Sequence, residues 1–439
     1  MEMIKRFWAW FALVTCFLYG PSPLFAKVYI DIDSPSFHRF PIAITDFKPL
    51  QPDTEKGDLP TWFSDTLSRS LLLTGYFSLI DKRAFLEDPT QAGITGETTR
   101  FEDWSTIGAD YLVKGGFQSD SRDLVAEFRL FDVVKGELVV GKRYSGALGD
   151  RNRMVLQFVN EILLALTGEP GLFDTQIAFA KRGPSATDLY TVNFDGSDLR
   201  RITDYHTLTL APRWSPDGRY LAFTSYRDGN PDIYLREMAS GKTQKIVSYR
   251  GLNLPGSWSR DSQRLLVTLS RDGNQEIYEM NLESRLLQRL TRDYSIDVSP
   301  VRSPDEKRIA FVSNRSGSPQ IYVMDADGGN VRRLTQDGNY NTSPSWSPKG
   351  KKIAYEGSVN GHFQIFVIGE EGGSPQQLTF EGGDHESPVW SPDGRYLAYS
   401  VRGYGRSRIE VINAGGQNPR VLHEGNDGCL TPFWSPRPR

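Results

Sequence analysis

The sequence is built around a phrase that returns six times at a constant spacing of 44 residues. Most copies read Trp-Ser-Pro-Asp-Gly or a close variant, and their first residues are Trp214, Trp258, Arg302, Trp346, Trp390 and Trp434. The phrase suits a tight turn, because Pro presets φ, Asp bonds to its own backbone and Gly takes the left-handed conformation. A period of this length indicates stacked supersecondary units.

Each repeat also carries strand signals in the same register. An apolar residue followed by an aromatic one recurs at Leu189-Tyr190, Ile233-Tyr234, Ile277-Tyr278, Ile321-Tyr322 and Ile365-Phe366. Hairpin sequences such as Arg227-Asp228-Gly229-Asn230 separate short runs of β-branched and aromatic residues. Four short antiparallel strands per repeat are typical of a propeller blade.

The two ends of the array complement each other. The segment from Ile177 to Thr203 has three strand signals but no preceding phrase, whereas the phrase at Trp434 has no strands after it. Joining these ends completes one blade, and the 263 residues from 177 to 439 then make about six units of 44. We therefore predict a six-bladed β-propeller closed by pairing of its first and last segments, which removes free sheet edges.

The repeated Trp residues are expected to fill the wedge between adjacent sheets, rather than to bind a ligand. Arg302 breaks this pattern, because an arginine cannot act there as an apolar wedge. The sequence leaves two alternatives for it, namely that it reaches solvent or that it pairs with an acidic residue.

The N-terminus has the features of a secretory signal peptide. Lys5 and Arg6 precede an apolar run from Phe7 to Tyr19, and a small-residue exit follows at Ala26. We predict a signal peptide over residues 1–26, cleaved after Ala26, and hence an exported protein. Its removal takes away two positive charges and one negative charge, so the net charge goes from −3 to −4. This balance argues against a nucleic-acid partner, and Cys429 as the one remaining cysteine allows no intrachain disulfide.

Residues 27–166 lack the 44-residue period and mix helix with strand signals. Apolar residues at four-residue spacing predict a helix from Thr61 to Leu73, and residues Arg151 to Leu166 predict a second one, with Asp150 as its cap. A hairpin is expected over 124–140. We predict an N-terminal α/β domain at 27–166, a short interdomain joint at 167–176 and the propeller at 177–439. Because the joint is short, the two domains are expected to touch.

The whole mature chain resembles one family of exported propellers. The joint reads Thr-Gly-Glu-Pro-Gly-Leu-Phe-Asp-Thr-Gln-Ile-Ala-Phe over residues 167–179, which is similar to the domain junction of the TolB family of the Tol–Pal system. Pro41-Ile42-Ala43-Ile44, Thr74-Gly75-Tyr76-Phe77 and the run from Ile107 to Val113 extend the likeness. The Trp-Ser-Pro-Asp-Gly phrase adds little, since other propellers also carry it.

The resemblance implies a periplasmic adaptor, with no enzymatic activity and no cofactor or metal. Such proteins bind TolA through the mature N-terminal segment and the lipoprotein Pal at the propeller mouth, and maintain outer-membrane integrity and invagination at cell division. The family is also connected with protein import, and other envelope proteins are possible further partners. A monomer is expected. The TolA-binding role falls here on Lys27, Val28, Tyr29, Ile30, Asp31, Ile32 and Asp33.

That segment alternates apolar and polar residues, so it can add as an edge strand to a partner sheet. The alternative is that it is simply the first strand of the α/β domain. If the segment detaches, Pal binding could change how it is held, which would couple the two partners through the joint.

The register of the repeat predicts which residues surround the mouth. The residues four positions before each phrase begin the innermost strands together, and they are joined by the residues just above them. The predicted Pal-binding set is Leu210, Leu252, Asn253, Leu254, Pro255, Val298, Tyr340, Asn341, Thr342, His385, Glu386 and Leu430. An apolar patch with a polar rim suits a partner protein. The alternative is that these side chains only plug the channel.

Two enzyme classes are the alternative to an adaptor. A peptidase-like hydrolase needs a nucleophile elbow, but no Gly-x-Ser-x-Gly occurs in the chain. A metal-dependent lyase needs ligands in one layer, whereas His206, His362, His385 and His423 fall at different positions within their repeats. The acidic run at Asp325–Gly328 resembles the start of a calcium loop but lacks the distal Glu, and is expected in a hairpin turn.

Overall fold

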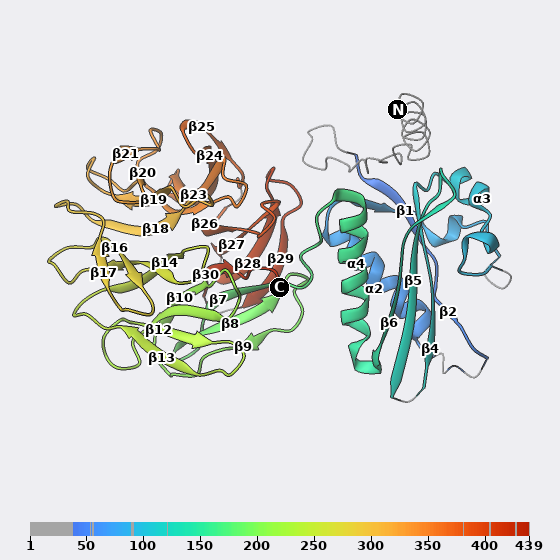
Figure 1. The fold of residues 1–439 in the computed structure, drawn as a ribbon. Helices are drawn as coiled ribbons and strands as arrows, with labels where there is room; N and C mark the ends of the chain where they lie inside the picture. The colour runs from blue at the N-terminus through green and yellow to red at the C-terminus, as the bar shows by residue number, and fades with distance from the viewer. Residues whose placement is uncertain are drawn as a thin grey trace, which may run out of the picture.

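The computed structural model describes residues 38–438 except 53, 55–56, 89–91, 121, 381, 404 and 426–427. Two parts lie side by side, a mixed α/β part and a ring of small sheets (Figure 1). The predicted signal peptide and the predicted TolA-binding segment Lys27–Asp33 lie outside the described residues. The four segment boundaries derived from the sequence therefore stay predictions.

The N-terminal part is one sheet of six strands with helices on both faces. The sheet has the order β3-β1-β4-β5-β6, and β2 pairs with β4. The strands are β1 (Phe40–Ile44), β2 (Lys48–Pro49), β3 (Phe77–Leu79), β4 (Tyr111–Ser119), β5 (Asp123–Asp132) and β6 (Glu137–Ala147). The helices are α2 (Leu59–Leu73), α3 (Phe101–Thr106) and α4 (Arg151–Thr167), with short 3₁₀ turns η1 (Lys82–Ala84), η2 (Gly96–Thr98) and η3 (Leu148–Asp150).

Alternation along the strands divides the core of this part into two layers. Ile42 and Ile44 of β1 pack in the layer beneath α2 and α4, whereas Ala43 between them packs against Trp104 of α3 on the other face. Successive side chains of a strand point to opposite faces. Both long helices were predicted from the spacing of their apolar residues, and the structure confirms them to within two residues at either end.

The predicted cap of α4 is wrong in its chemistry. Asp150 does occupy the N-cap position, but its side chain accepts no hydrogen bond from the helix. Its carboxylate instead accepts the amide N–H of Ala147 at 3.1 Å. The preceding 3₁₀ turn η3 brings this amide within reach. At the other end of α4, Gly168 has a φ of 79° and ends the helix in the left-handed conformation.

The second part is a ring of six four-stranded antiparallel sheets, which confirms the predicted six-bladed propeller. From the innermost to the outermost strand, three blades are β10 (Thr209–Trp214), β11 (Tyr220–Ser225), β12 (Asp232–Glu237), β13 (Thr243–Val247); β14 (Asn253–Trp258), β15 (Arg264–Leu269), β16 (Glu276–Asn281), β17 (Leu287–Arg289); and β18 (Asp297–Arg302), β19 (Arg308–Ser313), β20 (Gln320–Asp325), β21 (Arg332–Arg333). The other three are β22 (Asn341–Trp346), β23 (Lys352–Val359), β24 (His362–Gly369), β25 (Gly372–Gln377); β26 (Asp384–Trp390), β27 (Tyr396–Gly403), β28 (Arg406–Asn413), β29 (Arg420–Gly425); and β30 (Cys429–Trp434), β7 (Gln176–Arg182), β8 (Thr187–Asn193), β9 (Arg200–Arg201).

The last of these blades closes the ring from the two ends of the array, as predicted. Strand β30 supplies the innermost strand and pairs with β7, with Leu430 opposite Ala180 and Trp434 opposite Ile177. The Trp434 indole donates to the hydroxyl of Thr175 at 2.9 Å, so the first turn before β7 is also tied to the end of the chain.

In the five blades other than the closing one, the repeated phrase forms the turn between the first and second strand. Ser215 Oγ donates to Asp217 at 2.6 Å and accepts the amide of Tyr220, while Gly218 has a φ of 72°. Two of these five turns lack the Gly, and there Ser262 and Glu306 adopt the same left-handed conformation, with φ near 60°. The turn is therefore held by the Ser and Asp side chains even without the glycine.

The five Trp residues that begin the phrase are buried, and each packs against the preceding blade. Arg302 takes the second of the two alternatives left open by the sequence. Its side chain is only 4% exposed, and its guanidinium pairs with Glu279 in strand β16 of the preceding blade. At the position of Glu279, four other blades have an aliphatic residue, namely Leu235, Val323, Val367 and Val411.

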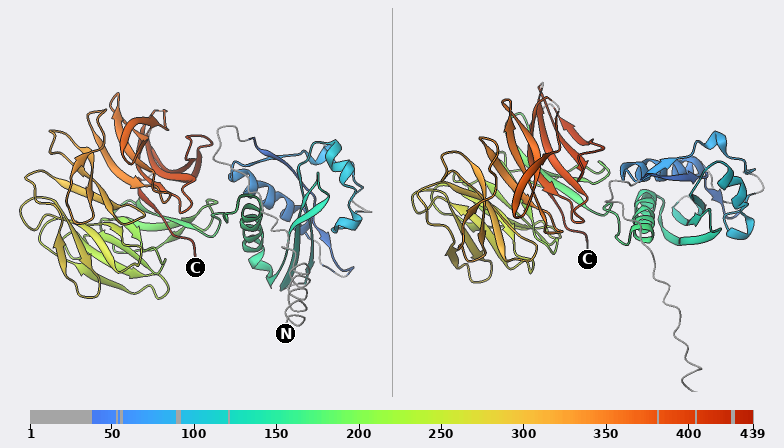
Figure 2. Two further views of the ribbon diagram at one scale, coloured as in Figure 1. Left: turned by 45° about the horizontal axis from the view of Figure 1, so that its top comes forward. Right: turned by 90° about the horizontal axis from the view of Figure 1, so that it is seen from above.

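The N-terminal part touches one end of the propeller through a small set of contacts. The hydroxyl of Tyr396 donates to the carbonyl of Thr74 at 2.7 Å, and Arg395 lies 3.5 Å from Glu169 in the joint. Arg437 donates to the carbonyl of Pro170 at 2.6 Å, so the C-terminus lies beside this junction in both views of Figure 2.

Candidate functional site

The six innermost strands all begin at one end of the ring, which we call the mouth. They start at Thr209, Asn253, Asp297, Asn341, Asp384 and Cys429. The turns that contact the N-terminal part follow the ends of these strands; for example, Tyr396 comes after β26, which runs from Asp384 to Trp390. The N-terminal part thus docks at the end of the propeller opposite the mouth.

Each innermost strand carries a β-bulge just below the mouth. The register breaks within each innermost strand, for example between Leu210 and Arg213. In five blades the residue at the bulge has a positive φ and a Pro follows it; these residues are Ala211, Ser299, Ser343, Ser387 and Thr431. The sixth blade has Pro255-Gly256 instead, and a Cβ on Gly256 would lie 2.7 Å from Pro300. An extra residue that bends the strand is the usual effect of a bulge.

The predicted mouth residues fall into two groups by exposure. Half-buried or exposed are Leu210, Leu252, Leu254, Val298, Tyr340, Thr342, Glu386 and Leu430. Buried are Asn253, Pro255, Asn341 and His385.

The polar members of the buried group hold the mouth together. The Asn253 carboxamide bonds to Tyr249, Gly251 and Pro231, and that of Asn341 bonds to Gln320. These two side chains therefore shape the mouth rather than present polar groups at its surface.

Sequence reasoning missed four exposed apolar residues next to these. They lie in the loops that lead from the outermost strand of one blade to the innermost strand of the next, and they are Leu208, Tyr294, Ile296 and Phe380. Tyr294 is fully exposed, and Phe380 is 75% exposed. Leu208 and Ile296 stand at the same repeat position as the predicted Leu252 and Tyr340, so the register could have indicated them. Tyr294 and Phe380 fall at other positions of the repeat, and only their place in the loops before the innermost strands could have indicated them. With Tyr340, these side chains surround the mouth with exposed apolar surface of the kind that marks interaction sites.

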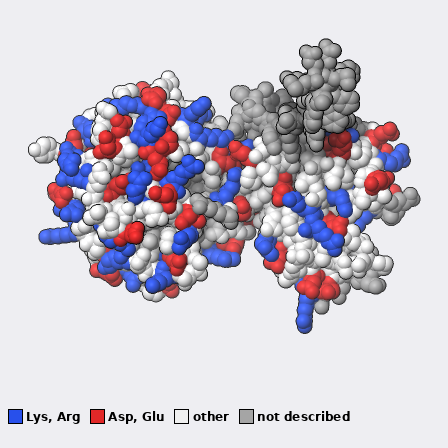
Figure 3. All heavy atoms as spheres, in the orientation of Figure 1, with Lys and Arg blue, Asp and Glu red and all other residues white. Residues whose placement is uncertain are grey.

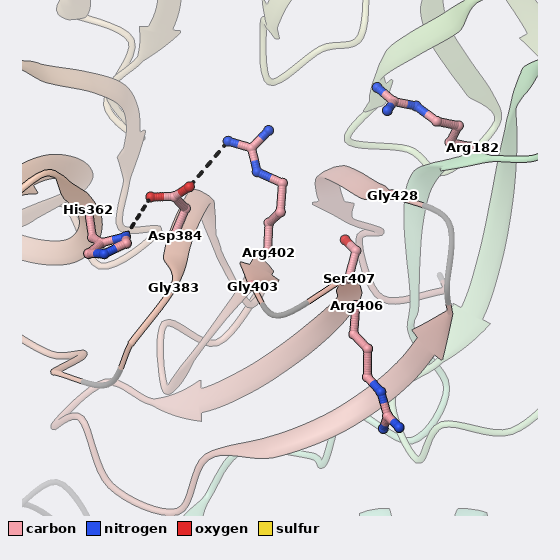
Figure 4. Close-up of a pocket in the computed structure, with 10 residues that line it drawn as sticks. Arg182, His362, Gly383, Asp384, Arg402, Gly403, Arg406, Ser407 and Gly428 are labelled. Atoms are coloured by element: carbon pink, nitrogen blue, oxygen red, sulfur yellow. Dashed lines mark hydrogen bonds and ion pairs between the residues drawn. The ribbon is translucent and has the colours of Figure 1, made fainter.

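One sector of the rim contains a polar cavity of about 560 Å³ between the last two complete blades and β7. Figure 4 shows Asp384 between His362 and Arg402, while Arg406 points away from them. Asp384 lies 3.5 Å from the His362 ring and 3.3 Å from the Arg402 guanidinium. Burial alone would raise the pKa of Asp384, but the Phe363 amide and Arg402 outweigh it and hold the pKa below its usual value.

Two carboxyl groups below this rim behave in the opposite way. Burial raises the pKa of Glu356, although Thr342 donates to it at 2.5 Å and the Ser387 amide donates at 2.6 Å. Burial likewise raises the pKa of Glu386, and Arg402 at 3.3 Å offsets this only in part. The site therefore combines one carboxylate whose pKa is lowered with two carboxyl groups whose pKa is raised by burial.

Charges of both signs are mixed on the face seen in Figure 3, over the N-terminal part as well as the propeller. This mixture gives the face no extended field of one sign. Within the described ranges, no three His, Cys, Asp or Glu side chains are placed to hold a metal ion. No helix among the described residues is long and apolar enough to cross a membrane.

Comparison with known proteins identifies the family. The profile described as TolB beta propeller domain matches residues 164–438, and that of the TolB amino-terminal domain matches residues 28–139. The chain belongs to the TolB family. The crystal structure of TolB from Acinetobacter baumannii is 27% identical, superimposes with a TM-score of 0.79, and covers 94% of this chain and 98% of its own.

Two relatives named Tol-Pal system protein TolB are more similar in sequence over shorter stretches. That of Syntrophus aciditrophicus is 54% identical over 213 residues, which cover 48% of this chain and 47% of the relative. That of Desulfosudis oleivorans is 41% identical over 231 residues, or 52% of each chain. This chain thus matches about half the length of these TolB relatives.

Proposed function

We propose that this TolB-family chain is a periplasmic adaptor of a Tol–Pal system that binds the lipoprotein Pal at the propeller mouth. The observation that carries the proposal is the concentration of exposed apolar side chains around the mouth, above all Tyr294, Tyr340 and Phe380. Tyrosine and other aromatic residues are the usual anchors of protein interfaces. The N-terminal part docks at the opposite end, so it leaves this surface accessible.

The proposed centre of the interface is the set of half-buried apolar residues that these exposed aromatic side chains surround. Leu210, Leu254, Val298 and Leu430 begin four of the six innermost strands at equivalent positions. Thr342 and Glu386 occupy the same position in the other two strands, so this ring is mainly apolar with two polar members, a composition that suits a protein interface. Asn253 and Asn341 are assigned a supporting role, because their carboxamides are already bonded within the mouth.

The test is a titration of the mature protein with the purified periplasmic part of Pal by calorimetry. Leu254→Asp and Tyr340→Ala are each expected to weaken binding by about 30-fold, the effect of losing about 2 kcal/mol at an interface anchor. Leu286→Asp is the matched control, because Leu286 is 73% exposed but lies in the hairpin between β16 and β17, away from the mouth. Equal affinities for all three variants would refute the proposed site.

We further propose that residues Lys27–Asp33 bind TolA and that export removes residues 1–26. Deletion of 27–33 is expected to abolish binding of the periplasmic domain of TolA while the affinity for Pal stays measurable. If TolA still binds to the deleted protein, this segment is not its site. Sequencing the N-terminus of the protein recovered from the periplasm is expected to begin at Lys27.

A further inference from the structure

The central channel below the mouth contains a single charged side chain. A cavity of about 230 Å³ lies there, lined by bulge residues and by the side chains that follow them. Among the described residues that line it, Arg213 is the only charged one. At the equivalent positions of the other innermost strands stand Ser257, Val301, Ser345, Val389 and Phe433. The arginine is therefore a particular feature of the first of these strands, not of the repeat.

No described carboxylate neutralises this arginine. One guanidinium N–H donates to the carbonyl of Pro212 at 2.9 Å, and the guanidinium lies 4.9 Å from the centre of the Phe433 ring. By contrast, Arg302 pairs with Glu279 and Arg420 donates to the carbonyl of Phe194, each across a blade boundary. Burial lowers the pKa of Arg213 to about 10, with no acidic neighbour to raise it. The side chain therefore stays protonated at neutral pH, in a place where an unpaired charge is unfavourable.

Unused hydroxyl groups line the same cavity. Thr268 is 1% exposed, and its Oγ1 has no hydrogen-bond partner in the described part of the chain. Thr431, whose Oγ1 is in the same condition, lies two residues before Phe433 in β30, the strand over which Arg213 is placed. Buried hydroxyls nearly always find a partner. A cation and two unused O–H donors that line one cavity form the donor set of an anion site.

We propose that the channel binds a small monovalent anion, held by the Arg213 guanidinium and by the hydroxyls of Thr431 and Thr268. The anion neutralises the one charge of the channel, which water could hydrate but not neutralise. Leu210 and Leu254 of the proposed Pal interface also line this cavity, but none of the three proposed anion ligands belongs to the residues assigned to Pal.

The first test is thermal unfolding of the mature protein in sodium chloride and in sodium gluconate at equal ionic strength. Chloride is expected to raise Tm in a saturable way, because a ligand of the folded state stabilises it by mass action. Arg213→Met is expected to raise the apparent Kd for chloride at least tenfold, and Thr431→Val to raise it by a smaller factor. Arg182→Met is the matched control, since it removes an exposed arginine at the mouth and leaves the channel intact.

The second test needs no variant. Crystals of the wild-type protein soaked in sodium bromide are expected to show an anomalous peak at the Arg213 guanidinium. A parallel titration with acetate tells a halide site from a carboxylate site, and loss of either response in Arg213→Met supports the proposal. The same chloride dependence in the Arg213 and Arg182 variants, or bromide found only on the outer surface, would overturn it.

Discussion

At the scale of single residues, Arg302 shows how a broken repeat can be compensated. Where other blades pack a Trp on an aliphatic residue, this blade boundary pairs Arg302 with Glu279. Glu279 also lies 3.3 Å from Arg264, and Arg302 donates its amide N–H to Ser257 at 2.7 Å. Arg302 and Glu279, the two residues that depart from the repeat, thus face each other in one contact, so neither is left as an unpaired charge.

Replacing one member of this pair should be worse than replacing both. Glu279→Val leaves the buried guanidinium unpaired and is expected to lower the free energy of unfolding by about 2–3 kcal/mol. The double variant Glu279→Val, Arg302→Trp restores the arrangement of the other blades and is expected to recover that loss. Urea denaturation measures both, with exposed Arg260→Gln as the control. A double variant no more stable than Glu279→Val would contradict this account.

Glu356 is expected to make stability depend on pH. Burial raises the pKa of its carboxyl group in the folded protein, so folding favours the protonated form. The stability that this carboxyl group contributes is therefore present in full at pH values below its unfolded-state pKa. That contribution is lost as the pH rises from there through the raised pKa of the folded state. Glu356→Gln is expected to raise Tm at pH 7 and to have little effect near pH 4. Exposed Glu283→Gln serves as the control, and an equal effect at both pH values would contradict the prediction.

At the scale of elements, the ring depends on pairing between segments about 250 residues apart. Strand β30 contributes its backbone to β7, its Trp434 side chain to the core and the Ser435 hydroxyl to the amide of Gln176 at 2.9 Å. In a closed ring each sheet lies between two neighbouring sheets, so no blade is left at a free end. The stability of every blade is thus coupled to this one closure.

Trp434→Ala is expected to lower the free energy of unfolding by about 3–5 kcal/mol, the usual effect of truncating a buried Trp. Thr175→Val separates the hydrogen bond from the packing, since it removes only the partner of the indole N–H, and should cost about 1 kcal/mol. Guanidinium denaturation measures both variants. Similar losses for the two would mean that the hydrogen bond, and not the packing of Trp434, secures the closure.

At the scale of the whole molecule, the two parts are joined by a contact that includes a buried phenol. Tyr396 is 7% exposed, and its hydroxyl reaches the end of α2 through the Thr74 carbonyl. Arg39 donates to Asn418 at 2.8 Å and adds a second link. The N-terminal sheet and the propeller therefore meet near the first described residues of the chain, which follow the proposed TolA segment.

Tyr396→Phe is expected to loosen this contact at a cost of about 1–2 kcal/mol, because the Thr74 carbonyl then loses its partner. Hydrogen exchange should increase around residues 74–77 and leave the other blades unchanged. Tyr220→Phe is a matched control, since Tyr220 holds the same repeat position in another blade but makes no contact with the N-terminal part. Exchange that rises equally in both variants would argue against a role in joining the two parts.

The sequence by itself determined the propeller, its six blades, their closure and the location of the mouth. It could do so because a fixed period repeats local rules, namely a turn phrase, alternating strands and a wedge residue, and each rule acts over a few residues. The spacing of apolar residues likewise predicted helices at 61–73 and 151–166, which the structure places at 59–73 and 151–167.

Only the tertiary structure decided how individual polar groups are used. The partner of Arg302 and the lone charge of Arg213 in the channel depend on how neighbouring blades meet. The amide bound by Asp150 and the burial of Asn253 depend on the geometry of the turns around them. A repeat fixes where a residue stands in its blade, but the groups that face it come from the neighbouring blade and from the bulges. Those neighbours depart from the repeat independently, so their pairing is settled only when the ring closes.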